Sequence, residues 1–191
     1  SNFGKGGINH EYKGWDEEIP KAEYWEQLFR VSKNQIVWGA NYMTEFLKPS
    51  RCWIFWDKGT GDNSYVDGEL AWCSFDKVEK KYSRFWSGRN AKERGDIDRV
   101  HPTQKPILLC EEIIKTYTNI GDCVLDNCMG SGTIPIACLN TKRVCIGIEK
   151  EKDIYLKAIE RIKTKFSDLM FSEGDDFLNC FLPITQIEAG A

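Results

Sequence analysis

The chain contains no long apolar run. No stretch of its 191 residues approaches the roughly 20 consecutive apolar residues that a membrane span needs. The first residues also lack the basic and apolar regions of a signal peptide. Because an apolar fraction of 41% is ordinary for a globular protein, we expect one soluble domain with no membrane contact, located in the cytoplasm.

Cysteine pairs of the C-x-x-C type are absent, although the chain has eight cysteines. This spacing argues against a zinc knuckle or a redox motif, and we predict no metal site. Most of the cysteines are embedded in apolar runs, so we expect reduced thiols that pack in the core. The set is Cys52, Cys73, Cys110, Cys123, Cys128, Cys138, Cys145 and Cys180.

An overall excess of positive charge is also missing, since the net charge is -3. A whole-chain value averages over separate faces, and local charge is more informative. Residues 77–99 are rich in cations interleaved with Tyr82, Phe85 and Trp86, a mixture that suits contact with phosphates and bases. A solvated loop is the alternative. The candidate DNA-binding cations are Lys77, Lys80, Lys81, Arg84, Arg89, Lys92 and Arg94.

The pattern of apolar residues predicts an α/β protein. In the first part we expect a helix over residues 20–31 and short strands over 35–40, 52–56, 69–75 and 82–86. In the second part we expect helices from Pro106 to Tyr117, over 133–139 and over 154–166, with strands over 123–127 and 144–148. The alternation of strands and helices implies parallel strands.

A glycine-rich turn joins the predicted strand at residues 123–127 to the helix at 133–139. In open α/β sheets, ligands bind at the carboxyl ends of the strands, which is where this turn lies. Gly130 and Gly132 permit positive φ and close approach of a ligand, and the Asp126 carboxylate can accept hydrogen bonds from a cationic amino group. Glu149 follows at the distance from which an acid reaches ribose hydroxyls in such folds.

A nicotinamide or flavin site is the obvious competitor for this turn. Its G-x-G-x-x-G motif needs a third glycine so that the helix packs closely. Pro135 stands at that position here, which argues against a dinucleotide. A plain glycine turn without a ligand is the other alternative, because short glycine patterns give many false positives.

The segment from His101 to Pro106 reads His-Pro-Thr-Gln-Lys-Pro, and it leads through a helix into the Asp126 to Thr133 turn. This order resembles the permuted, β-type amino-group DNA methyltransferases of phage and restriction-modification systems, and the resemblance is specific from residue 100 to about residue 162. It implies a Rossmann-like S-adenosylmethionine-dependent methyltransferase fold, with a mixed, mostly parallel sheet and helices on both faces. Residues 32–38, 53–58 and 69–75 are more loosely similar to phage-type adenine methyltransferases.

The resemblance also implies a cofactor, S-adenosyl-L-methionine, and a set of residues that hold it. In the family, the Thr-Gln-Lys region lies beside the methionine end of the cofactor, the glycine-rich turn cradles it, and the acid that corresponds to Glu149 holds the ribose. The candidate cofactor-binding residues are His101, Thr103, Gln104, Lys105, Asp126, Asn127, Met129, Gly130, Ser131, Gly132, Thr133 and Glu149. For His101, a loop histidine that stabilises a turn is the alternative.

The catalytic motif of the family, of the Asp-Pro-Pro-Tyr type, is missing. The chain has six prolines, and no two are adjacent. In the family this motif orients the amino group of an extruded base toward the methyl donor. We hypothesise that the motif and its strand lie before Ser1, and that residues 1–7 form the loop that follows it. Within one domain, we then expect a catalytic-side half (1–87), a connection (88–100), a cofactor half (101–166) and a C-terminal segment (167–191).

The leading functional hypothesis is transfer of a methyl group to an exocyclic amino group of double-stranded DNA, with N6 of adenine as the expected target and N4 of cytosine as the alternative. A non-catalytic DNA- or cofactor-binding remnant is a second hypothesis, which the missing motif allows. A methyltransferase for RNA, protein or a small molecule is a third. The recognition sequence, an oligomeric state and a cognate restriction nuclease are left open.

Overall fold

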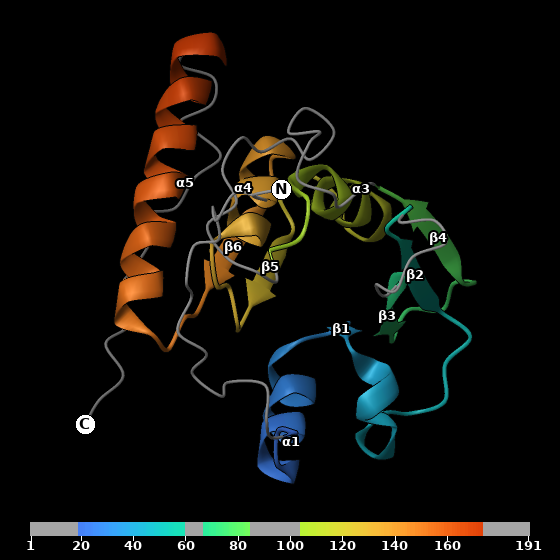
Figure 1. The fold of residues 1–191 in the computed structure, drawn as a ribbon. Coiled ribbons are helices and arrows are strands. Elements are labelled where there is room, and N and C mark those ends of the chain that lie inside the picture. The colour runs from blue at the N-terminus through green and yellow to red at the C-terminus, as the bar shows by residue number, and fades with distance from the viewer. Residues whose placement is uncertain (1–18, 60–66, 85–103, 174–191) are drawn as a thin grey trace, which may run out of the picture. The chain divides into compact units, whose positions relative to one another are not determined.

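The computed structural model describes residues 19–59, 67–84 and 104–173 (Figure 1). The chain divides into two compact units. The first comprises Ser1–Trp53 and Leu70–Val78, and the second comprises Ile54–Glu69 and Glu79–Ala191. Among the described helices, none is long and apolar enough to cross a membrane.

The first unit contains helix α1 (Ala22–Val31), strand β1 (Ile36–Trp38) and most of strand β3 (Gly68–Cys73). β1 and β3 pair antiparallel, with Val37 opposite Trp72. Two short 3-10 turns, Ala40–Tyr42 and Thr44–Phe46, follow β1. The buried Trp25 of α1 stacks on Phe46 with ring centroids 5.3 Å apart, so aromatic packing ties the helix to the second turn.

In the second unit, strand β2 (Trp53–Asp57), of which only Trp53 belongs to the first unit, pairs parallel with β4 (Lys80–Ser83). Trp56 of β2 is 1% exposed, and its indole nitrogen donates to the Arg84 carbonyl at 3.0 Å. The remaining elements are α3 (Ile107–Tyr117), β5 (Cys123–Asp126), α4 (Thr133–Asn140), β6 (Val144–Gly147) and α5 (Lys152–Glu173).

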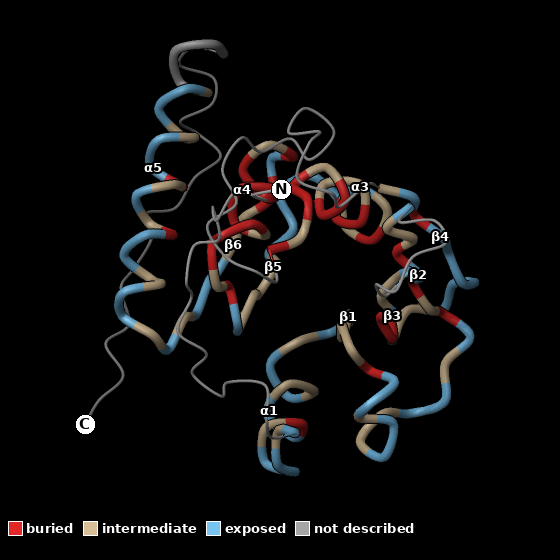
Figure 2. Tube along the Cα trace, viewed as in Figure 1, coloured by how far each residue is buried: buried red, intermediate tan, exposed pale blue. Residues whose placement is uncertain are grey.

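Strands β5 and β6 are parallel neighbours joined through α4, with Asp126 opposite Gly147. α4 is apolar on all sides because it contacts α3, α5 and both strands. Its Pro135 lies in the first helical turn, where a missing N–H breaks no intrahelical bond. One core cluster joins three helices, and Figure 2 shows the buried segments in red. It consists of Ile107, Cys110, Ile114, Ile136, Ala137, Cys138 and Ile162.

The parallel pairs β2–β4 and β5–β6, together with the antiparallel pair β1–β3, confirm the predicted mixed α/β class. Most predicted elements are present with ends shifted by one or two residues. Two predictions need correction. β4 begins at Lys80 rather than at Tyr82, and α5 runs to Glu173 rather than ending at Phe166, so it enters the segment 167–191 that we had set apart.

The prediction about the cysteines is partly correct. Cys52, Cys73, Cys110 and Cys138 are buried free thiols and Cys145 is half-buried, but Cys123 and Cys128 are exposed. Cys123 is the first residue of β5 and Cys128 lies in the turn that follows the strand, so neither is in the interior of the strand. Cys180 lies outside the described residues.

Candidate cofactor site

The turn between β5 and α4 is tied to β6 by backbone hydrogen bonds. The Met129 N–H donates to the Ile148 carbonyl at 2.9 Å, and the Ile148 N–H donates to the Asp126 carbonyl at 2.8 Å. The Gly132 N–H donates to the Met129 carbonyl at 2.8 Å. The turn therefore has a fixed shape at the carboxyl ends of two parallel strands, as the sequence predicted.

Two glycines in the turn have positive φ, at 49° for Gly130 and 79° for Gly132. Gly132 is also required for packing, because a Cβ atom there would lie 3.1 Å from Ile162 and 3.3 Å from Ala158 of α5. A Cβ atom at Gly130 would meet nothing closer than 3.9 Å, so the backbone there is open to a ligand.

The close packing that a dinucleotide motif assigns to its third glycine is provided here by Gly147 of β6. A Cβ atom on Gly147 would lie 2.5 Å from the Met129 sulfur and 3.5 Å from Pro135. Met129 is 5% exposed, so its side chain is buried between the turn and β6. This contact explains how α4 approaches the strands with a proline in its first turn.

The Asp126 carboxyl group is the electrostatic centre of the site. Its pKa is raised from the ordinary 3.8 to about 6, mainly by burial and to a smaller extent by the neighbouring Glu149 carboxylate. A hydrogen bond from the Cys128 N–H, at 3.3 Å, and the positive charge of Lys105 act in the opposite direction. Among the described residues, Asp126 forms no salt bridge, and a partly buried carboxylate of this kind is a strong acceptor for a cationic ligand group.

Glu149 folds back over the same turn. One of its carboxylate oxygens accepts the Gly130 N–H at 2.9 Å, and the other accepts the Glu151 N–H at 2.9 Å. Each carboxylate oxygen has a second lone pair that remains available to a hydroxyl group. Glu149 therefore stabilises the glycine turn, in addition to its predicted role in binding the ribose hydroxyls.

Ser131 and Thr133 are buried, and their hydroxyl oxygens are 3.3 Å apart. The Ser131 carbonyl accepts a hydrogen bond of 2.8 Å from Arg161 of α5, a residue that the sequence analysis did not identify. Asn127 is half-buried in the turn. The Ser131 and Thr133 side chains are thus engaged within the protein, and the Ser131 carbonyl is held by α5.

Lys105 and Gln104 precede α3 in the same unit, and Gln104 is 7% exposed. The Lys105 ammonium lies 3.1 Å from Glu69, which also binds Lys58 at 2.9 Å. Attraction from these two lysines lowers the pKa of Glu69 although burial, the largest single influence, opposes it. Sequence spacing gave no signal for Lys58 and Glu69, because strand pairing brings them to Lys105. His101 and Thr103 lie outside the described residues.

The candidate DNA-binding cations occupy different places. Lys77 is exposed after β3 in the first unit, whereas Lys80, Lys81 and Arg84 belong to the β4 segment of the second unit. Lys81 of β4 pairs with Asp57 at 2.7 Å, and Arg84, directly after β4, pairs with Glu112 of α3. Arg89, Lys92 and Arg94 lie outside the described residues.

Comparison with known proteins gives a family match and a fold match. A family model described as DNA methylase, of the N6/N4 methyltransferase type, matches residues 31–160. The crystal structure of an M1.HpyAVI–SAM complex matches with a TM-score of 0.56 and 26% identity, covering 74% of this chain and 81% of that chain. The predicted Rossmann-like methyltransferase fold is thereby confirmed.

Two similar relatives are type II methyltransferases. The type II methyltransferase M.HpaI of Haemophilus parainfluenzae is 43% identical over 67 residues, which are 35% of this chain and 21% of the relative. The type II methyltransferase M.BglI of Bacillus subtilis is 33% identical over 118 residues, which are 60% of this chain and 30% of the relative. The matched segments therefore span less than a third of these relatives' length.

Proposed function

This chain belongs to the N6/N4 DNA methylase family, and from that membership we propose that it transfers a methyl group from S-adenosyl-L-methionine to an exocyclic amino group in double-stranded DNA. The observation that supports this proposal most is the Asp126 to Thr133 turn, in which a carboxylate with a raised pKa stands beside an open backbone at Gly130. The cofactor supplies an electrophilic methyl group.

The residues of the turn fit such a cofactor chemically. The Asp126 carboxylate accepts hydrogen bonds from its cationic amino group, and Gly130 lets the ligand approach the backbone. The unused lone pairs of Glu149 accept the ribose hydroxyls. The methionine end of the cofactor remains assigned to the segment before α3, with His101, Thr103, Gln104 and Lys105 as the candidates.

We further propose that the cations of residues 77–99 contact the DNA backbone, because Arg and Lys provide most phosphate contacts. The proposed set remains Lys77, Lys80, Lys81, Arg84, Arg89, Lys92 and Arg94. The proposed target is N6 of adenine. A cognate restriction nuclease, suggested by the type II relatives, and a cytoplasmic location are parts of the same proposal.

Transfer of radiolabelled methyl groups tests the proposal directly. The intact protein is incubated with labelled S-adenosylmethionine and either duplex DNA or duplex RNA, and the labelled nucleosides are then separated. We expect label in DNA as N6-methyladenine. Label in N4-methylcytosine would show that the target is cytosine rather than adenine. Label in RNA would overturn the substrate, and cofactor binding without any transfer would favour the non-catalytic alternative.

A further inference from the structure

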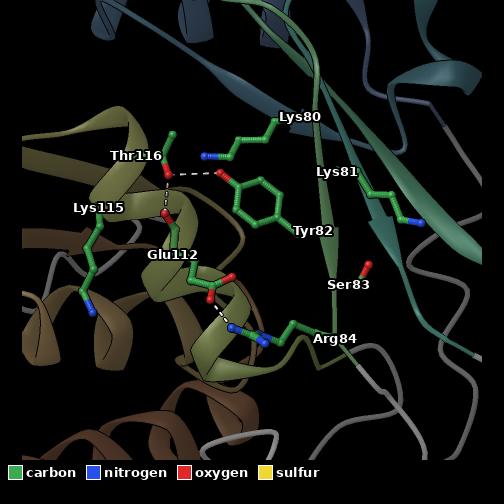
Figure 3. Close-up of a pocket in the computed structure, with 8 residues that line it drawn as sticks. All are labelled: Lys80, Lys81, Tyr82, Ser83, Arg84, Glu112, Lys115 and Thr116. Atoms are coloured by element: carbon green, nitrogen blue, oxygen red, sulfur yellow. Dashed lines mark hydrogen bonds and ion pairs between the residues drawn. The ribbon is translucent and has the colours of Figure 1, made fainter.

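An open hollow of about 530 Å³ lies between β4 and α3, within the second unit (Figure 3). Four of its eight lining residues are cationic and one is acidic. The lining consists of Lys80, Lys81, Tyr82, Ser83, Arg84, Glu112, Lys115 and Thr116. Lys115, Thr116 and Glu112 come from α3, which sequence reasoning connected only with the cofactor segment.

Alternation along β4 sorts its cations into two groups. Lys80, Tyr82 and Arg84 point toward α3 in Figure 3, whereas Lys81 points to the other side of the strand, where it pairs with Asp57 at 2.7 Å. Lys81 is thus already neutralised away from α3. The stretch of cations that looked uniform in sequence has only part of its charge directed at the hollow.

The floor of the hollow is held by hydrogen bonds across it. The buried Tyr82 hydroxyl group is 3.1 Å from the Thr116 hydroxyl oxygen, and Arg84 binds Glu112. Thr116 in turn donates to the Glu112 carbonyl at 2.7 Å. Because these contacts join β4 to α3, the two elements present their cations in a fixed arrangement.

Two lysines at the hollow remain available to an anion. The Lys80 ammonium lies over the Tyr82 ring, 5.4 Å from its centroid, and in the described part of the chain no carboxylate lies within 4 Å of it. Lys115 is exposed and has only a loose pair with Glu111, at 3.6 Å within its own helix. A surface pair of this kind contributes little and is readily exchanged.

We propose that this hollow is a phosphate-contact site for the DNA backbone, in which Lys80 of β4 and Lys115 of α3 bind phosphates while Glu112 holds Arg84 in place. The proposal rests on the proposed function, since it takes the polyanion to be the DNA substrate. It adds α3 to the DNA-contacting surface. The start of α3 then follows the cofactor segment, and the end of α3 contacts DNA.

The salt dependence of DNA binding tests this site. Affinity of the intact protein for duplex DNA is measured at several salt concentrations for the wild type and for K80Q/K115Q. Each phosphate contact contributes about 0.9 to the slope of log affinity against log salt, so we expect the slope to fall by about 2. Affinity should also fall by about 10-fold or more at 0.1 M salt.

Three controls keep the outcomes distinct. K152Q/K157Q removes the same charge from the exposed face of α5 and should leave the slope unchanged, whereas K80R/K115R should retain it. Unaltered binding of S-adenosylmethionine reports that the variants are folded. An unchanged slope in K80Q/K115Q, or an equal loss in K152Q/K157Q, would overturn the site. Absence of DNA binding by the wild type would instead overturn the proposed function.

Discussion

The ionised carboxylate of Asp126 lowers the free energy of unfolding, and a bound cationic ligand can offset this loss. Its folded pKa of about 6 exceeds the ordinary 3.8, so ionisation destabilises the folded state progressively between these values and fully above pH 6. The shift of about two units corresponds to at most about 3 kcal/mol. We expect Asp126→Asn to raise the free energy of unfolding by about 1–3 kcal/mol near pH 7.5, measured by urea denaturation.

The pH dependence of the stability gain shows whether it comes from removing the Asp126 charge or from a change that is independent of charge. The advantage of Asp126→Asn should shrink as the pH falls from 6 toward 3.8, because the wild-type carboxyl group is already neutral in the folded state and becomes neutral in the unfolded state near 3.8. A stability difference that does not vary with pH would contradict the assigned cause. Affinity for S-adenosylmethionine should fall about tenfold for each pH unit below 6, since the ligand needs the ionised carboxylate.

Gly132 combines a left-handed φ with a lack of space. We expect Gly132→Ala to lower the free energy of unfolding by about 2–4 kcal/mol, because strain of about 1 kcal/mol adds to overpacking against Ile162 and Ala158. Thermal and urea denaturation measure it. Gly121→Ala is the matched control, since Gly121 has φ 84° and nothing within 4 Å. Equal losses in both variants would show that the contact with α5 does not matter.

At the level of elements, Glu69 of β3 forms salt bridges with Lys58, directly after β2, and with Lys105, shortly before α3. The lysine side chains are only 15% and 21% exposed, so Glu69→Gln leaves two partly buried cations without a counter-charge. We expect a loss of about 2 kcal/mol in the free energy of unfolding near neutral pH.

The pKa of Glu69 is lowered in the folded state from its ordinary 4.5, so its stabilising effect is present above pH 4.5. It is lost as the pH falls through the lowered folded value. The difference between the wild type and Glu69→Gln should therefore be constant above pH 5 and should decline below about 4.5. Asp76→Asn, which breaks an exposed pair with Arg51, is the control and should change stability by less than about 0.5 kcal/mol.

Sequence periodicity was sufficient for elements with strong local signals. Pro106 marked the start of α3 and the alternation after Gly121 located β5, α4 and β6. It was insufficient where packing decides. β4 starts at two lysines, Lys80 and Lys81, because pairing with β2 rather than apolar character defines it. α5 continues past Phe166 to Glu173, where the apolar residues Leu169, Met170 and Phe171 are consecutive and do not repeat at helical spacing.

The candidate site was predictable to the extent that it is contiguous. The glycine turn, Asp126 and Glu149 follow from one βαβ unit, and the structure places them together. Lys58 and Glu69 reach Lys105 only through strand pairing, and Arg161 reaches Ser131 only through the packing of α5. No spacing rule connects these residues, so a structure was needed to find them.

At the scale of the whole molecule, one feature unites the fold with the proposed function. The turn at the carboxyl end of β5 is braced on three sides, by β6 through Met129, by α5 through Arg161 and by Glu149 through Gly130. Such bracing places the Asp126 carboxylate before a ligand arrives, and preorganisation of this kind favours tight binding. The central claim is thus that this turn holds S-adenosylmethionine.

Isothermal titration of S-adenosylmethionine into the intact wild-type protein and Asp126→Asn, near pH 7.5, tests that claim most directly. We expect one site in the wild type and an affinity about 30-fold or more lower in the variant, because a buried charge-assisted contact is lost while the fold becomes more stable. A folded wild-type protein that does not bind the cofactor, or a variant that binds it equally well, would contradict the assignment.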